Sequence, residues 1–388
     1  MPAEPGKLTL VPAHEQQTAL GFTRTPSEDD PRRDPQLLGA LARIAPGTDL
    51  RQALDDVIRS REGALIVIGD PEALSFLYSG GIRLDQPFTA QLLYELAKMD
   101  GAIVLDPKLT KLAYANVQLM PDPTIPSDET GTRHRTAERV AKQTGALVIS
   151  ISQQRSTITV YLGPTRYQLN PVTEVLPKTN QALATLDTYR QRLEQVLTRL
   201  TALEFQNAVV LDDVLVVIQR AQMTIRIAVY IERDCVELGA EGRVIRMRLD
   251  ELVGDVPRER QAVVHDYFAE PPDDATVKAV LERLESLRYR EMLELERLAE
   301  LLGYRRDVNP LDHSVAPRGF RILSHIPRLP EQIVKHVVSD MDGLDAILRA
   351  SQRDLEAISG VGTVRAREIR EGLRRLQEHN LVDRYLQL

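Results

Sequence analysis

Short apolar runs separated by helical periods constrain the fold of this chain more than any other feature. Between residues 64 and 162, five runs have the length and composition of buried strands: Ala64 to Ile68, Ala102 to Leu105, Leu112 to Val117, Ala146 to Ile151 and Ile158 to Leu162. Helical periods at Ala90 to Met99 and Thr136 to Thr144 lie between them, and Gly145 ends the second. This alternation predicts an α/β domain with a mixed sheet flanked by helices, which we place at residues 36–177.

The remainder of the 388 residues predicts a multi-domain protein. A flexible, proline-rich arm is expected at residues 1–35, where six prolines and a mixed-charge run break any apolar period. Residues 178–310 carry leucines at helix-face spacing and are interpreted as an all-α spacer domain, with a short interruption around Gly239 to Gly254. Asn309-Pro310 ends this pattern and leaves residues 311–388 as a C-terminal domain.

Composition and charge exclude several classes of protein. Cys235 is the only cysteine, so no disulfide can form within the chain. No run of 18 apolar residues occurs, and the amino terminus lacks the pattern of a secretory signal, so we expect a cytoplasmic protein with no membrane span. The net charge of −7 argues against a wholly basic surface, whereas residues 315–388 hold 12 Lys+Arg against 10 Asp+Glu. Any contact with DNA is therefore expected in the C-terminal domain.

The densest polar cluster is Gly131-Thr132-Arg133-His134-Arg135-Thr136, at the expected start of the helix that Gly145 ends. A helix amino terminus presents unpaired N–H groups and the positive end of the helix dipole, which favour anionic oxygens. Two guanidiniums and two hydroxyls in the same run add donors that suit phosphate. The simpler alternative is that Thr132 only caps the helix and the basic residues form a solvated face. So many donors in consecutive positions favour a polyphosphate site.

Two weaker elements accompany this cluster. Asp100-Gly101 precedes the strand at Ala102; the aspartate is either an ordinary turn residue or, beside a triphosphate, a ligand for Mg²⁺ or Mn²⁺ that helps to activate a ribose hydroxyl. Ser150-Ile151-Ser152 ends a strand in hydroxyl groups, which fits either a ligand site or an ordinary polar turn. The chain has no G-x-x-x-x-G-K-[ST] loop and no G-x-G-x-x-G at a helix start, so the common ATPase and dehydrogenase classes lose support.

Asp100-Gly101-Ala102 and Gly131-Thr132-Arg133-His134-Arg135-Thr136-Ala137-Glu138-Arg139 resemble the two signature motifs of the diadenylate cyclase (DAC) domain family. The order of an α/β domain, a helical middle and a helix-hairpin-helix tail resembles one branch of that family. The resemblance implies condensation of two ATP molecules into cyclic di-AMP with release of two pyrophosphates, at a site shared by facing subunits. It therefore also implies a homo-oligomer with facing DAC domains, and an octamer in that branch.

The resemblance assigns roles to individual residues. Asp100 matches the metal-binding and catalytic aspartate, and Arg133, His134 and Arg135 match catalytic residues of the triphosphate-binding run. The residues implied to bind ATP are Gly101, Leu119, Thr132, Arg133, His134, Arg135, Thr136 and Ser152. Many DAC domains have Glu after this serine, whereas Gln153 stands here. A neutral amide is a poor ligand for Mg²⁺ or Mn²⁺, so Asp100 remains the one expected protein ligand of the metal.

The C-terminal domain contains a glycine hairpin between two expected helices. Ser351-Gln352-Arg353-Asp354 has the pattern of a capping box, Ser359-Gly360-Val361-Gly362 forms the turn, and a second helix runs to Leu376. Glycine leaves the backbone bare, so N–H groups of the hairpin can touch DNA phosphate. The candidate DNA-binding residues are Gly360, Gly362, Arg365, Arg367 and Arg370. The alternative is a tight turn used for subunit packing.

Ile326-Pro327-Arg328-Leu329-Pro330 precedes another expected helix and is interpreted as a degenerate first copy of the same unit. Because it has no glycine, we expect it to have a structural role and not to grip phosphate. Phosphate contacts carry no base information, so the expected partner is DNA recognised by its shape, such as branched or damaged DNA, with salt-sensitive binding.

The leading hypothesis is a diadenylate cyclase whose activity responds to DNA bound by the C-terminal hairpin. One rival is a non-enzymatic scaffold that binds DNA junctions and only senses ATP. Another is a nucleotidyltransferase with a different product, such as a linear dinucleotide.

Overall fold

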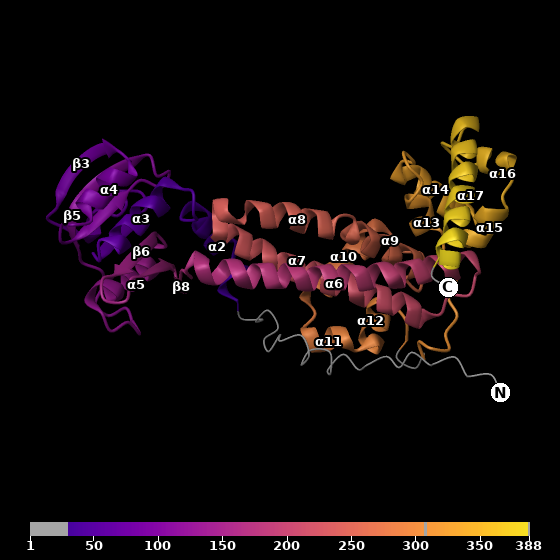
Figure 1. The fold of residues 1–388 in the computed structure, drawn as a ribbon, viewed down its shortest axis with the longest axis horizontal. Helices are drawn as coiled ribbons and strands as arrows, with labels where there is room; N and C mark the ends of the chain where they lie inside the picture. The colour runs from indigo at the N-terminus through magenta and orange to yellow at the C-terminus, as the bar shows by residue number, and fades with distance from the viewer. Residues whose placement is uncertain (1–29, 306–308, 387–388) are drawn as a thin grey trace. The chain divides into compact units, whose positions relative to one another are not determined.

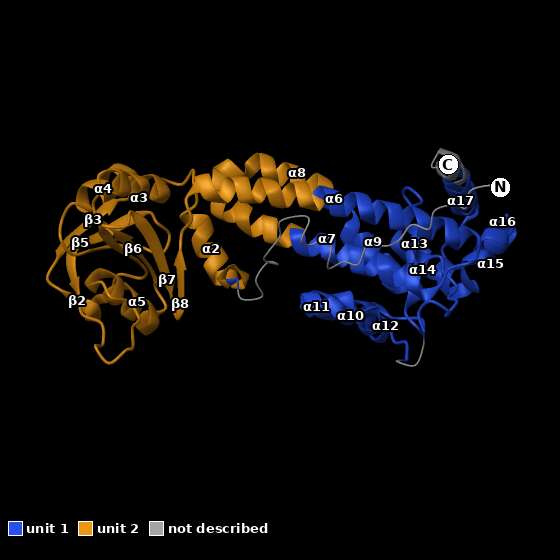
Figure 2. Cartoon of the chain, turned by 60° about the horizontal axis from the view of Figure 1, so that its bottom comes forward, with its two compact units in different colours: residues 1–30, 187–227, 253–388 blue, residues 31–186, 228–252 orange. Residues whose placement is uncertain are grey.

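The structure, a computed structural model, describes residues 30–305 and 309–386. The chain divides into two compact units (Figure 2). The α/β unit contains Pro31–Leu186 and Ala228–Leu252, and the helical unit contains Asp187–Ile227 and the described part of Val253–Leu388. Two long helices, α6 (Val172–Phe205) and α7 (Leu211–Leu238), belong to both units.

The expected flexible arm lies outside the described residues from 1 to 29, and its stated end at residue 35 is wrong. A short 3-10 helix, η1, covers Pro31–Arg33, and α2 (Pro35–Arg43) follows at once, with Asp34 accepting from the backbone N–H of Gln36. The buried Arg32 donates to Asp234 at 2.5 Å and to Glu237 at 3.3 Å. The segment that begins at Pro31 therefore belongs to the α/β unit, because α7 supplies two carboxylates that pair with this arginine.

In the described part of the chain, eight strands form one sheet in the order β2-β5-β4-β1-β6-β7-β8, and β3 also pairs with β5. The strands are β1 (Ala64–Ile68), β2 (Tyr78–Ser79), β3 (Ile82–Pro87), β4 (Ala102–Leu105), β5 (Lys111–Leu119), β6 (Leu147–Ser152), β7 (Thr157–Leu162) and β8 (Thr165–Gln168). β1 and β4 are parallel, and the other pairs are antiparallel. The predicted mixed sheet is confirmed.

Helices cover both faces of this sheet (Figure 1). Alternate residues of each central strand point to opposite faces, so β1 contributes Ile66 to one core and Val67 to the other. The helices α2, α3 (Asp49–Arg59) and α4 (Ala90–Leu96) pack on the first face, whereas α5 (Thr132–Thr144) packs on the second. A further short helix, η2, covers Ser75–Leu77. The start of α5 is therefore held against the sheet by Ala137, Val140 and Ala141.

The helical parts follow the expected texture with one correction. The end of the α/β domain was expected near Pro177, but α6 begins at Val172 and continues through that proline. Pro177 lies in the second turn of α6, beyond the first four residues whose N–H groups have no partner within a helix, so its missing N–H removes one intrahelical hydrogen bond. The remaining spacer elements are η3 (Gly239–Gly242), α8 (Arg243–Val253), α9 (Val256–Tyr267), α10 (Asp274–Ser286), α11 (Tyr289–Leu293) and α12 (Leu295–Leu301). The expected interruption corresponds to positive φ at Gly239 and Gly254, with a helix between them.

Five helices form the C-terminal part of the helical unit: α13 (Phe320–Ser324), α14 (Glu331–Asp340), α15 (Gly343–Arg349), α16 (Gln352–Glu356) and α17 (Thr363–Leu386). They share one apolar core that includes Leu323, Val337, Leu355 and Ile369. The predicted order of an α/β domain, a helical spacer and a helix-hairpin-helix domain is confirmed.

Among the described residues, one helical stretch, Leu211–Tyr267, is apolar and long enough to cross a membrane by composition alone. Its most apolar window has a mean hydropathy of 1.5, and 56% of that window is buried inside the fold. Val214, Leu215 and Ile218 from this stretch belong to the core of the helical unit, which accounts for the hydropathy.

Candidate functional site

The amino terminus of α5 is open for a ligand. Gly131 occupies the N-cap position with extended backbone, and no side chain in the described part of the chain accepts a hydrogen bond from the first helical N–H groups. Thr132 is the first residue of the helix, so the alternative that Thr132 caps the helix is wrong. Because a glycine cap leaves the N–H groups bare, the positive end of the helix is available to an anion.

Arg133 lies directly over the backbone of Gly63, the residue before β1. A Cβ atom added to Gly63 would lie 1.9 Å from Nη1 and 2.9 Å from Cζ of Arg133, and 3.2 Å from the carbonyl oxygen of Ile151. Ile151 pairs with Ala64 across the sheet. The guanidinium is therefore held where β1 begins and β6 ends. Sequence reasoning missed Gly63, since nothing near residue 63 in the sequence indicates an arginine 70 positions away.

His134 begins a chain of hydrogen bonds that sequence reasoning also missed. Its Nδ1 lies 2.9 Å from the hydroxyl of Tyr161 on β7, which donates to Glu129 Oε1 at 2.7 Å. Arg166 on β8 donates to the same carboxylate oxygen at 2.5 Å. Partial burial lowers the pKa of His134, and the positive charges of Arg166, Arg133 and Arg155 lower it further against the opposing effect of Glu129.

The negative charge of Glu129 is stabilised by its hydrogen bonds to Tyr161 and Arg166. Burial disfavours the carboxylate, but hydrogen bonds from Tyr161 and Arg166 outweigh burial and leave the pKa of Glu129 below its ordinary value. Burial, with the neighbouring carboxylate, raises the pKa of Tyr161 well above its ordinary value. At neutral pH, Glu129 is therefore ionised and Tyr161 is neutral.

The loop before α5 is fastened to the helix itself. Arg135 donates to the backbone carbonyl oxygens of Glu129 and Thr130, and Arg139 donates to that of Ile125 at 2.9 Å. Glu138 accepts from the hydroxyl of Ser127. Arg135 was expected to act on the triphosphate, and in this structure its side chain supports the loop that ends in Gly131. Thr136, one residue further along the helix, is half-buried.

The Asp100-Gly101 turn is fixed by the neighbouring strand β5. Gly101 has φ +95°, and a Cβ atom there would lie 2.8 Å from the backbone carbon of Asn116. Asn116 itself has φ +53°, where a register shift between β4 and β5 marks a bulge. A side chain at Gly101 has no room, so the turn that presents Asp100 requires glycine.

The strand register brings the other expected residues to one end of the sheet. Ala102 pairs with Leu65 in parallel and with Val117 in antiparallel register, while Ile151 pairs with Ala64. Residues next to these pairs in the sequence therefore lie at the same end of the sheet, where β1 and β4 begin and β5 and β6 end. These residues are Gly63, Asp100, Gly101, Leu119 and Ser152. Ser152 and Ser150 also lie on the sheet face that α5 covers, because they alternate with Ile149 and Ile151 in the opposite core.

The donor set at this end fits a divalent cation that is shared with phosphate. Asp100 is exposed and has no hydrogen-bond partner among the described residues. The same residues contain no group of three His, Cys, Asp or Glu side chains that could hold a metal alone. Mg²⁺ commonly binds through one or two carboxylates together with substrate phosphates and water, so a lone aspartate suits that arrangement.

The C-terminal hairpin has the predicted capping box. The Ser351 hydroxyl accepts from the backbone N–H of Asp354, whose carboxylate accepts from that of Ser351. Gly360 has φ +81°, whereas Gly362 has ordinary backbone and nothing within 4 Å of an added Cβ. Gly360 is therefore needed for the turn, and Gly362 leaves the start of α17 uncovered.

The arginines of this hairpin fall into two groups. Arg365 donates to the carbonyl oxygen of Gly360 at 2.7 Å and so holds the turn. Arg367 and Arg370 are exposed and have no ion pair among the described residues. Both side chains follow the exposed Gly362 on α17.

The first hairpin repeats the turn without its glycines. The N–H of Leu329 donates to the carbonyl oxygen of Ile326, as that of Val361 does to Ile358. Arg328 has φ +65° where the second hairpin has Gly360, and Pro330 stands where it has Gly362. Proline has no N–H, so the first copy lacks one of the donors that phosphate would need.

Comparison with known proteins finds two family regions in the chain. A family model described as the DisA bacterial checkpoint controller nucleotide-binding (DAC) domain matches residues 51–165, and a model of the DisA linker region matches residues 169–311. The chain is 44% identical over 354 residues to the DNA integrity scanning protein DisA of Acetivibrio thermocellus, which covers 91% of this chain and 98% of that protein. The chain belongs to the DisA family.

Other members of the DisA family are equally similar. The DisA protein of Kineococcus radiotolerans is 47% identical over 353 residues, covering 91% of this chain and 98% of that protein. Among solved structures, a double mutant of DacA from Staphylococcus aureus is 24% identical, covers 34% of this chain and 85% of that chain, and has a TM-score of 0.25.

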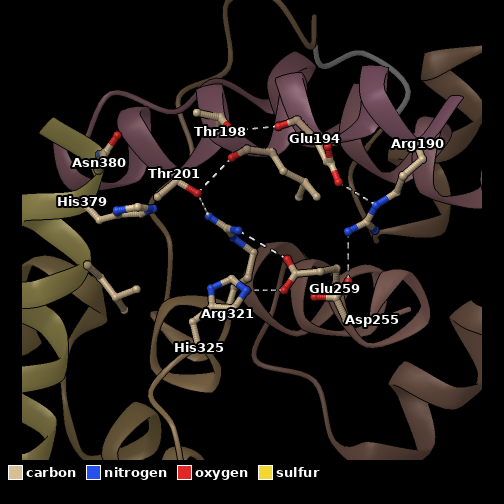
Figure 3. A pocket seen from close by; sticks show the side chains of 12 residues that line it. Arg190, Glu194, Thr198, Thr201, Asp255, Glu259, Arg321, His325, His379 and Asn380 are labelled. Atoms are coloured by element: carbon tan, nitrogen blue, oxygen red, sulfur yellow. Dashed lines mark hydrogen bonds and ion pairs between the residues drawn. The ribbon is translucent and has the colours of Figure 1, made fainter. Parts of the chain in front are cut away.

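Within the helical unit of this DisA family member, a buried ion network lies beside a cavity of about 250 Å³ (Figure 3). Arg321 of α13 donates to Glu204 of α6 at 3.1 Å, to Glu259 of α9 at 3.4 Å and to the Thr201 hydroxyl at 2.6 Å. Glu259 also forms a hydrogen bond with His325, which lies at the start of the first hairpin. Burial disfavours the Glu259 carboxylate, but His325 and Arg321 hold its pKa below the ordinary value. The network therefore joins two linker helices to the first hairpin.

Proposed function

We propose that this protein condenses two ATP molecules into cyclic di-AMP and two pyrophosphates. Membership of the DisA family supports a diadenylate cyclase type of nucleotidyltransferase. The observation that carries the proposal is the uncapped amino terminus of α5, where uncapped N–H groups lie beside the side chains of Thr132, Arg133 and His134. Such a set of fixed donors stabilises charge on a triphosphate, and nucleotidyl transfer depends mainly on positioning and charge stabilisation.

In the proposed reaction each 3′-hydroxyl attacks the α-phosphorus of the other ATP. One O–P bond forms and the bond to pyrophosphate breaks, while the hydroxyl proton leaves to solvent. Arg133 and the N–H groups of α5 would hold the triphosphate, and Ser152 would contact it from the end of β6. A Mg²⁺ or Mn²⁺ ion held by Asp100 and substrate phosphates would supply a Lewis acid that favours the ionised hydroxyl.

The proposal includes a homo-oligomer in the cytoplasm. Each site holds one ATP, so cyclisation requires two subunits with facing DAC domains, and we propose an octamer built from such pairs. The C-terminal hairpin would bind branched or damaged DNA by shape through Gly360, Gly362, Arg365, Arg367 and Arg370, and thereby modulate the cyclase.

The test of the enzyme is product identification. The full chain is incubated with ATP and Mg²⁺ or Mn²⁺, and the products are separated by mass. We expect cyclic di-AMP from the unmodified protein and none from Asp100→Asn, because an amide is a poor ligand for these ions. Bound ATP without turnover would instead support the scaffold, and a linear dinucleotide would support a different transferase.

The test of the DNA-binding hairpin uses Gly362→Leu. Because an added Cβ at Gly362 meets nothing within 4 Å, this variant keeps the fold while its side chain covers the start of α17. We expect loss of binding to branched DNA, measured by gel shift at fixed salt, with unchanged basal cyclase activity. Simultaneous loss of both activities would contradict the assignment of the two functions to separate domains.

A further inference from the structure

The polar chain from Arg166 through Glu129 and Tyr161 to His134 has a defined direction of hydrogen bonding. Arg166 can only donate, so its 2.5 Å contact gives a proton to Glu129. Ionised Glu129 can only accept, so the single hydroxyl proton of Tyr161 points to this carboxylate over 2.7 Å. The oxygen of Tyr161 then has only lone pairs left for His134.

This direction determines the protonation of the histidine ring. Nδ1 of His134, 2.9 Å from the Tyr161 oxygen, has to carry a proton and donate it. A neutral imidazole carries one ring proton, so Nε2 of neutral His134 has none. The Cδ2 atom beside Nε2 would lie 3.7 Å from a Cβ placed on Gly131, the cap of α5. The unprotonated edge of the ring therefore faces the helix start.

We propose that Glu129, Tyr161 and Arg166 are positioning residues that fix His134 with its proton on Nδ1, so that the ring takes up a second proton on Nε2 when a polyphosphate binds. A lone pair on Nε2 repels phosphate oxygen, whereas a proton there donates to it. The imidazolium that results is compensated through Tyr161 by the charge of Glu129. This inference rests on the proposed function of the site, and it adds three residues that sequence reasoning did not find.

The charged groups around the ring give the proposal its pH dependence. Partial burial lowers the pKa of free His134 and Glu129 raises it, while Arg166 on β8, Arg133 on α5 and Arg155 in the turn between β6 and β7 lower it further. Bound polyphosphate adds negative charge and raises this pKa again. Because the protonated ring binds better, affinity is highest at low pH and weakens as pH rises between the free and the bound pKa values. One linked proton limits the change to about tenfold in affinity per pH unit.

Proton uptake can be measured without turnover. In the presence of Mg²⁺, the full-length protein is titrated with 3′-deoxy-ATP, an analogue that lacks the attacking hydroxyl. The titration is repeated in two buffers of different ionisation enthalpy and at several pH values. The difference in binding heat between buffers gives the protons taken up per site. We expect uptake of up to one proton per site in the unmodified protein and none in His134→Gln.

The variants separate positioning from a merely structural role. Tyr161→Phe removes the acceptor at Nδ1, so neutral His134 can place its proton on Nε2 and donate without uptake. Glu129→Gln keeps the shape and removes the charge, so uptake falls in this variant as well. Tyr167→Phe is the matched control, because the Tyr167 hydroxyl donates to Glu237 on the other side of the sheet. This variant should keep full proton uptake.

The outcomes are distinct from those of the cyclase test. If the unmodified protein binds 3′-deoxy-ATP without proton uptake, or if both Tyr161→Phe and Glu129→Gln keep full uptake, the positioning role is refuted even when cyclic di-AMP is made. If uptake behaves as expected but ATP gives no cyclic product, the proposed function fails and the role of the three residues in binding remains.

Discussion

Gly63→Ala tests whether the position of Arg133 sets the rate of nucleotidyl transfer. The new Cβ would lie 1.9 Å from Arg133 Nη1, and contacts under 3.0 Å essentially never occur, so the guanidinium has to move by about 1.1 Å. Gly63 does not have positive φ, so alanine adopts its backbone without strain. The atom that must move is the far end of a flexible side chain, and the fold should therefore tolerate the change.

A displacement of about 1 Å in a group that holds the reacting phosphate costs on the order of 10²-fold in rate. We expect Gly63→Ala to lower kcat/KM for cyclic di-AMP synthesis by about 10- to 100-fold, which corresponds to about 1.4 to 2.7 kcal/mol of transition-state stabilisation. Steady-state synthesis is measured beside thermal unfolding. Gly39→Ala is the control, because nothing lies within 4 Å of its added Cβ. Full activity in Gly63→Ala with an unchanged melting temperature would refute the reasoning.

Two further predictions concern the backbone and the buried ion network. Gly101→Ala places a Cβ 2.8 Å from the backbone of Asn116 at a positive φ, so we expect loss of cyclase activity and of about 1–3 kcal/mol of stability in urea unfolding; unchanged unfolding would contradict the steric argument. Arg321→Ala leaves Glu204 buried without its cation, since the two side chains are 1% and 0% exposed, so we expect a loss of about 3–5 kcal/mol. Its control, Arg349→Ala, removes a pair that is 79% and 44% exposed and should cost under about 1 kcal/mol; equal losses in both variants would refute this distinction.

The sequence predicts strands best where both faces are buried. β1 and β4 match the predicted runs to the residue, because both strands are buried along their length and so are continuously apolar. β2, β3 and β8 were missed. β3 carries Arg83 and Asp85 and is mostly exposed, and β8 alternates between half-buried and exposed residues, so neither has the apolar signal of a buried strand. The polar run from Gly131 to Thr136 was predicted to lie at the start of a helix, and α5 begins within it at Thr132, although the helical period itself was recognised only from Thr136.

The partners of the site could not be predicted, because they come from tertiary contacts. Tyr161 and Arg166 lie on strands that follow the helix, and only the packing of α5 on the sheet brings them to His134 and Glu129. In the sequence, Tyr161 is indistinguishable from the apolar residues of its strand. The importance of Gly63 likewise depends on a tertiary contact, because Arg133 lies over its backbone.

The two C-terminal hairpins show how a single turn can be kept while its use changes. Both close with the same backbone hydrogen bond, from Leu329 to Ile326 in the first and from Val361 to Ile358 in the second. A positive φ is required at one position of this turn, and Arg328 adopts it at a cost in strain that Gly360 avoids. The first hairpin follows His325, which is bonded to the linker network, so this copy is tied to the protein interior. The second copy has glycines at both positions, so its backbone carries no side chain there, and it is therefore the copy through which we propose that DNA binds.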